Sequence, residues 1–244
     1  MVARKKGLYV VLTLGLMMFA AQGTALAEIK TIKGETDWMT VDDTAKRITF
    51  SATVTKNASK SAVTDWGQRG QAWIGCKGGS QEAFFIFTTD VPRPQVDGAI
   101  RNMGVMYRNQ IPKEGWKEHR DLKETTSPKD FLDGDPVLVS VRFEKEGKKL
   151  ETSLETLIDE KIEINKKDVL RPYTPHFVYH GTGEAIHYPS GCIVCPSDCF
   201  GGIITDNRLP ILTYDSWYRV NWERMPPVDS KVEIVLIFSA SSSL

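Results

Sequence analysis

A repeat of apolar residues at every second position is the feature that most constrains the fold of this chain. The clearest example is residues 137–143, where every second residue is Val or Phe. This spacing is typical of a β-strand with one face in a core. Residues 144–148 then offer a turn in which Gly147 can adopt a positive φ. We therefore predict a hairpin whose second strand begins near Leu150.

Several other segments have the composition of strands. Residues 47–55 alternate in the same way, with Ile48, Phe50 and Val54 on the predicted inner face. Two segments that are apolar on both faces are predicted to be central strands, and three shorter segments are further candidates. In chain order these five segments are residues 84–87, 177–179, 192–194, 202–205 and 234–238.

Helical patterns are few. Residues 94–103 are predicted to form a helix that begins near Pro92 and ends at Gly104. Residues 154–160 are a candidate for a short second helix. The proline-containing, polar residues 108–135 are predicted to form a long loop or an insertion. The pattern as a whole indicates an α+β fold, a strand-rich single domain with one or two short helices and long loops.

The N-terminus has the composition of a signal peptide. Arg4, Lys5 and Lys6 precede an apolar run over residues 8–21, and small residues follow at Ala25 and Ala27. This order predicts a Sec signal peptide over residues 1–27, cleaved after Ala27, and a domain over residues 28–244. We therefore expect a periplasmic or secreted protein without a membrane span after cleavage.

Charge and motifs exclude several classes of function. The chain has 31 basic and 31 acidic residues, and removal of the signal peptide leaves 28 basic residues against 31 acidic ones. Such a balance does not indicate a nucleic-acid partner, so the expected partner is a periplasmic protein or a small ligand. The chain has no nucleophile elbow, P-loop, dinucleotide fingerprint or HExxH motif. We therefore assign no catalytic or cofactor-binding residue and favour a protein that is not an enzyme.

Tryptophans suggest a second kind of site. Trp38, Trp66, Trp73 and Trp116 precede or flank loops rich in glycine and charge. Such residues either line a carbohydrate- or aromatic-ligand surface or cover the edge of the core, and we favour the core edge.

Three cysteines lie within eight residues, at Cys192, Cys195 and Cys199, and the remaining one is Cys76. In an exported protein such thiols are expected to form disulfides, and this is the interpretation that we favour. The more relaxed local pairs are Cys192–Cys199 and Cys195–Cys199. Cys76 would then bridge to the remaining thiol of the cluster.

Two alternatives use the same residues differently. Four thiolates are the number that a zinc ion or an iron–sulfur cluster requires, and His180 and His187 lie just upstream as further candidate ligands. This alternative implies a metal-binding electron carrier. The other alternative is a thiol oxidoreductase acting through Cys192 and Cys195, although no helical pattern follows to lower a thiol pKa.

A series of short motifs in the C-terminal third resembles the YdjY-type periplasmic proteins of bacteria. The motifs are FVYHG at residues 177–181, SGCIVCP at 190–196, GIIT at 202–205, RLP at 208–210, NWE at 221–223, MPP at 225–227 and VEIVL at 232–236. The resemblance implies an exported protein, and some members of the family are labelled ferredoxin-like because of the cysteine run. Residues 108–135 are longer than the connection that the resemblance implies.

These observations predict an exported YdjY-like protein that acts as a non-catalytic binding or accessory module. Its cysteine-rich loop would be held by disulfides, with metal or iron–sulfur binding as the alternative.

Overall fold

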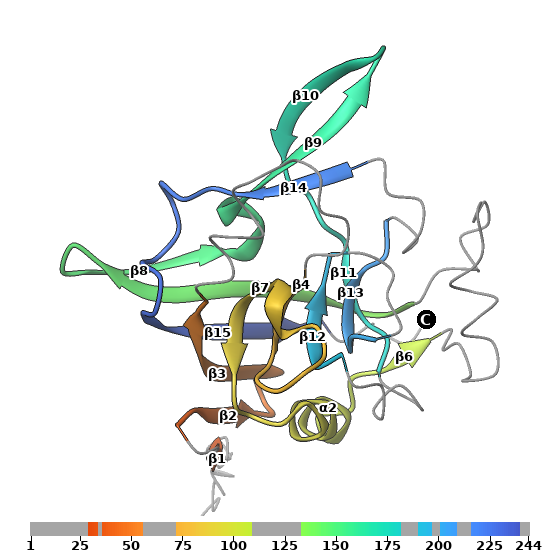
Figure 1. The fold of residues 1–244 in the computed structure, drawn as a ribbon. Helices are drawn as coiled ribbons and strands as arrows, with labels where there is room; N and C mark the ends of the chain where they lie inside the picture. Colours follow the sequence, from red (N-terminus) through yellow and green to blue (C-terminus); the bar gives the residue numbers. More distant parts are fainter. Residues whose placement is uncertain are drawn as a thin grey trace, which may run out of the picture.

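Eight strands close into a β-barrel in the computed structural model of the chain (Figure 1). The structure describes residues 29–33, 36–55, 72–108, 133–181, 190–196, 201–208 and 216–239. Around the barrel the strands follow the order β3-β15-β7-β11-β13-β12-β4-β5, and β5 then pairs with β3. The barrel strands are β3 (Arg47–Val54), β4 (Ala72–Cys76), β5 (Phe85–Thr89), β7 (Asp133–Lys145), β11 (Phe177–Tyr179), β12 (Cys192–Cys195), β13 (Ile204–Asp206) and β15 (Lys231–Phe238).

The long strands β3 and β7 make closure possible, because one edge of each strand pairs with several other strands along its length. One edge of β3 pairs with β15, while the other pairs first with β2 (Trp38–Asp42) and then with β5. Strand β7 pairs with β15 on one edge and with β6 (Tyr107–Arg108), β11 and β8 (Lys148–Ser153) on the other. Strand β1 (Ile29–Lys33) extends the sheet beyond β2. A closed barrel leaves few unpaired edges along its wall.

The predicted α+β class was wrong, because the described residues form a mainly β structure with a single α-helix. The segment predicted as a second helix makes only the 3₁₀ turn η4 (Leu154–Leu157) before β9 (Ile158–Ile164) begins. Leu154 and Leu157 are buried in the core. The β-branched Thr156 and Ile158 favour extended backbone, so the turn does not continue as a helix.

Most of the individual elements were predicted correctly. The predicted hairpin is β7–β8, and Gly147 adopts a φ of 73° in its turn. The predicted helix is α2 (Arg93–Asn102), which lies at the lower end of the barrel in Figure 1. It buries Val96, Ala99 and Ile100 against the core. A further 3₁₀ turn, η1 (Glu82–Phe84), precedes β5. The predicted signal peptide and residues 109–132 of the predicted long loop lie outside the described residues.

A second, three-stranded sheet stands above the barrel (Figure 1). It has the order β10-β9-β14, with β10 at Lys167–Pro172 and β14 at Ser216–Val220. Strands β9 and β10 form a projecting hairpin, and Asn165 and Lys166 both have positive φ at its turn. Two successive residues with positive φ are typical of the tight turns that join twisted antiparallel strands.

Candidate functional site

The cysteine-bearing strand β12 is part of the barrel wall. It pairs in parallel with β13 and antiparallel with β4. The ladder with β4 shifts register between Cys192 and Val194, as in a β-bulge. Residues three apart on a regular strand point to opposite faces, but an extra residue brings them to the same face. Cys192 and Cys195 accordingly pack in one buried cluster with Ala72 and Phe85.

Polar contacts fix both ends of the cysteine segment. The Ser190 hydroxyl donates to the carbonyl oxygen of Gly201 at 2.7 Å and accepts from the Cys192 amide at 3.2 Å. The buried guanidinium of Arg93 donates through Nη1 to the same Gly201 oxygen at 2.7 Å and to the Ser190 hydroxyl at 3.3 Å. Gly191 has a φ of 79°, a conformation that favours glycine. The start of α2 is thereby joined to residues on both sides of the cysteines.

Cys76 lies beside this segment but packs against a different part of the protein. Its amide donates to the Gly191 carbonyl at 2.8 Å, and Cys192 lies directly opposite the neighbouring Gly75. Successive strand residues point to opposite faces, and Cys76 packs against the main core rather than against the cluster that holds Cys192. The Cys76 thiol donates to the carbonyl oxygen of Val91 at 3.3 Å. Cys76, Cys192 and Cys195 form no disulfide with one another.

Burial raises the pKa of the Cys76 thiol to about 11, against the opposing effect of the Arg93 backbone amide. The thiol is therefore protonated at neutral pH. A protonated thiol is neither a nucleophile nor a metal ligand.

The other predicted site residues lie in different places. Cys199 and His187 fall outside the described residues. His180 is buried just after β11, and its amide donates to the carbonyl oxygen of Ile203 at 3.2 Å. Within the part of the chain that the structure describes, no three His, Cys, Asp or Glu side chains form a group that suits a metal ion. Metal ligation by Cys192, Cys195, Cys199, Cys76, His180 and His187 therefore stays a prediction.

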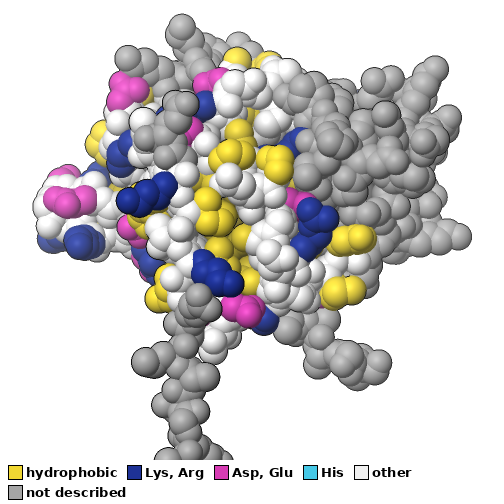
Figure 2. Space-filling model, turned by 90° about the horizontal axis from the view of Figure 1, so that it is seen from below, with side chains coloured by type: hydrophobic (Ala, Val, Ile, Leu, Met, Phe, Trp, Pro, Cys, Tyr) yellow, Lys and Arg dark blue, Asp and Glu magenta, His cyan; other side chains and the backbone are white. Residues whose placement is uncertain are grey.

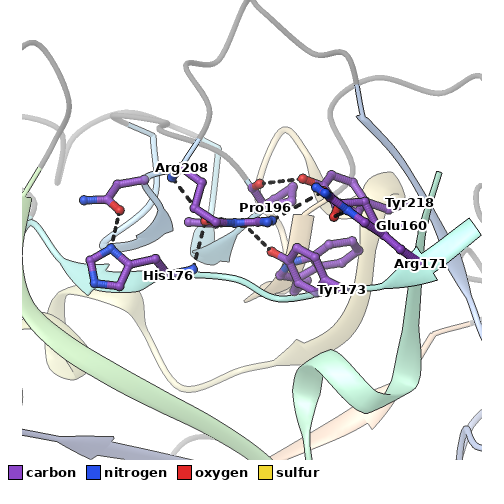
Figure 3. Close-up of polar contacts among 10 residues, drawn as sticks. Glu160, Arg171, Tyr173, His176, Pro196, Arg208 and Tyr218 are labelled. Atoms are coloured by element: carbon purple, nitrogen blue, oxygen red, sulfur yellow. Dashed lines mark hydrogen bonds and ion pairs between the residues drawn. The ribbon is translucent and has the colours of Figure 1, made fainter. Parts of the chain in front are cut away.

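A buried ionic network that the sequence did not reveal lies beside the cysteine segment (Figure 3). Asp206 at the end of β13 is fully buried and accepts from Arg208 through both Nε and Nη2, the latter at 2.7 Å. The Tyr173 hydroxyl donates to the same carboxylate at 3.1 Å, and the His176 amide donates to it at 3.0 Å. Burial, and then the nearby Asp206 charge, raise the pKa of Tyr173 well above its ordinary value, so this hydroxyl remains a donor.

A second buried carboxylate completes the network. Glu160 of β9 is fully buried and pairs with Arg171 Nε at 2.7 Å and with Arg208 Nη2 at 3.4 Å. Burial alone would lower the pKa of Arg208, but its hydrogen bonds to Asp206 raise that pKa above the ordinary value. Both carboxylates are thus held as ion-paired acceptors, which is a structural arrangement rather than one suited to proton transfer.

The network reaches the cysteine segment through an aromatic cluster. Tyr218 of β14 donates its hydroxyl to the carbonyl oxygen of Pro196, the residue after Cys195, at 3.3 Å. The Trp73 indole donates to the Tyr173 hydroxyl at 3.2 Å, and the rings of Trp73, Tyr173 and Tyr218 pack edge to face. Trp73 is therefore a core residue, as the sequence favoured. The upper sheet and β12 are held together by these contacts (Figure 3).

The fold and site define a β-barrel domain whose wall includes a buried, bulged strand with two cysteines. The YdjY domain family model matches residues 39–237, and the chain belongs to this family. The resemblance in the C-terminal motifs is thereby confirmed. No curated protein and no solved structure matches the chain. Among the described residues, no helix has the length and apolar character needed to cross a membrane.

Proposed function

We propose that this YdjY-family protein is exported to the periplasm and acts there as a non-catalytic binding or accessory module. Its cysteine segment is a structural staple in this proposal. The main observation that supports the proposal is the position of the thiols. Cys192 and Cys195 are buried near each other on one face of β12, while Cys76 packs against the main core.

The chemistry of the nearby groups supports a structural role. The pKa of Cys76 is raised, so this thiol does not provide a thiolate at neutral pH. Asp206 and Glu160 are paired with arginines. The groups most suited to nucleophilic or acid–base catalysis are therefore engaged in holding the fold.

Export would place the segment in an oxidising compartment. We propose that one disulfide forms among Cys192, Cys195 and Cys199, while Cys76 stays reduced. Two thiols would lose two protons and two electrons to a periplasmic disulfide donor, which is reduced to a dithiol. A bond within this segment stabilises only a short loop, so its main effect is to fix the bulged strand against β4.

Expression of the full chain in a Gram-negative host, followed by fractionation, mass measurement and metal analysis, tests this proposal. We expect periplasmic protein that begins at Glu28 and contains no stoichiometric zinc or iron. Retention of residues 1–27 in a cytoplasmic protein would contradict export. One zinc ion or iron–sulfur cluster per chain would contradict the structural role and support the metal-binding alternative.

A further inference from the structure

An open groove with a volume of about 630 Å³ lies beside the β7–β8 hairpin, apart from the cysteine segment. Residues of β2, β3, β7, β8 and β15 line it, together with Thr36 just before β2. Small-molecule sites in proteins commonly fall within a volume range of about 300–1,000 Å³. The groove is therefore large enough for a ligand of several rings.

A row of directly paired residues crosses the groove from strand to strand. Ser51 lies opposite Glu233, Glu233 opposite Arg142, and Arg142 opposite Glu151. Directly opposite residues of antiparallel strands point to the same face. Arg142 Nε lies 2.8 Å from Glu151 and Arg142 Nη1 lies 3.9 Å from Glu233. The three charged side chains are 36 to 45% exposed, so each also faces solvent.

The groove has no net charge among its lining residues. Three of them are basic and three are acidic, namely Arg142, Lys149, Lys231, Glu144, Glu151 and Glu233. Figure 2 shows basic and acidic side chains next to each other on the left, where the β7–β8 hairpin lies, rather than a field of one sign. This balance does not favour an anion or a cation. It offers donors and acceptors side by side, which suits a neutral ligand with adjacent hydroxyl groups.

Apolar surface is available in the same groove. Trp38 is half-buried at the start of β2, where its amide donates to the Ser51 hydroxyl at 3.0 Å. Its aromatic ring provides apolar contact for the C–H face of a sugar ring whose edges carry hydroxyl groups. Hydrogen bonds between charged side chains and such hydroxyls are stronger than those between two neutral groups.

We propose that this groove binds a neutral oligosaccharide, with a sugar ring against Trp38 and its hydroxyls on Arg142, Glu233 and Glu151. The inference rests on the proposed role as a binding module and gives that module a ligand class. The sequence favoured a core-edge role for Trp38 over a carbohydrate surface, and the proposal assigns it the carbohydrate surface instead.

Isothermal titration calorimetry of the full chain with three neutral sugars, cellotetraose, tetra-N-acetylchitotetraose and maltotetraose, tests the proposal. We expect at least one to bind, with a Kd that stays within about twofold between about 50 and 500 mM salt, since a neutral ligand releases no counterions. Arg142→Met keeps the apolar stem but removes the donors, and should raise Kd by about tenfold or more. Trp38→Ala should do the same, whereas Trp38→Phe should retain most of the affinity.

Lys167→Met on the distant β10 strand is the matched control and should leave Kd unchanged. Near-UV circular dichroism checks that each variant is folded. If Trp38→Ala unfolds, the Arg142→Met and Glu151→Gln variants are used to test the proposal instead. Absence of binding for all three sugars at millimolar concentration would overturn the proposal, as would binding that these groove variants leave unchanged. Selective binding of a charged peptide would overturn it as well. Export and disulfide formation are measured separately, so failure here leaves those results standing.

Discussion

Cys192 lies directly opposite Gly75 in the β4–β12 ladder, which places Cys76 one residue away and in a different packing cluster. The Cys76 thiol lies near enough for the charge of Cys192 to help raise its pKa, but it packs against the main core and not on the face that Cys192 and Cys195 share. This packing separates one partly buried thiol from the group that we propose to oxidise.

The raised pKa of Cys76 predicts a loss of stability at alkaline pH. The unfolded thiol ionises near pH 9.0, whereas the folded thiol ionises near pH 11, so the folded state holds more protons between these values. The stabilisation is fully present below pH 9 and is lost as the pH rises toward 11. We expect the wild type to lose about 2 kcal/mol over this window relative to Cys76→Ala, as measured by urea unfolding. Parallel pH profiles for the two proteins would contradict the assignment.

Removal of the Asp206 charge should destabilise the protein strongly. Asp206→Asn removes the closer of the two carboxylates that pair with Arg208 and leaves only the 3.4 Å contact to Glu160. We expect a loss of about 3 kcal/mol in the free energy of unfolding, because breaking a buried pair leaves a poorly compensated charge. Glu151→Gln is the control, since its pair with Arg142 is exposed and should contribute less than about 1 kcal/mol. Equal effects from both substitutions would show that the buried network does not stabilise the fold.

Two glycines should respond to alanine in opposite directions. A Cβ at Gly202 would lie 2.8 Å from Cys195 Sγ, so Gly202→Ala should destabilise the cysteine segment by about 1–3 kcal/mol. Nothing lies within 4 Å of a Cβ at Gly98 in α2. Gly98→Ala should therefore stabilise the protein by about 0.5–1 kcal/mol through its helix propensity. Thermal unfolding of both variants measures the contrast. A Gly202→Ala variant with the stability of the wild type would indicate that β12 packs less closely against residue 202.

Local patterns in the sequence predicted most of the barrel strands, but not β4, the upper sheet or the way in which the strands assemble. The alternation in β7 and the turn at Gly147 are local signals, and both were read correctly. Closure of the barrel depends on two residue pairs between β3 and β5, including Val54 and Phe87, which no local pattern records. The α+β class was wrong in part because residues 154–160 were a candidate for a second helix, whereas the segment turns once and continues as β9.

The candidate site shows the same limit. The cysteines could be located from their spacing, but the bulge that turns Cys192 and Cys195 to one face depends on the register with β4. The ionic network was missed because its two carboxylates lie far apart in sequence, and Arg208 pairs with Glu160 across 48 residues. Isolated charges in a sequence are read as surface residues. A signal that pointed this way was the pair of tyrosines and the pair of histidines that follow Arg171 within residues 171–180.

Disulfide mapping tests the central claim most directly. Protein from an oxidising periplasm would be alkylated in the native state, digested without reduction and analysed by mass spectrometry. We predict a disulfide between two of Cys192, Cys195 and Cys199, and a Cys76 thiol that is alkylated only after the protein is unfolded. A disulfide between Cys76 and any of these three cysteines would contradict the account.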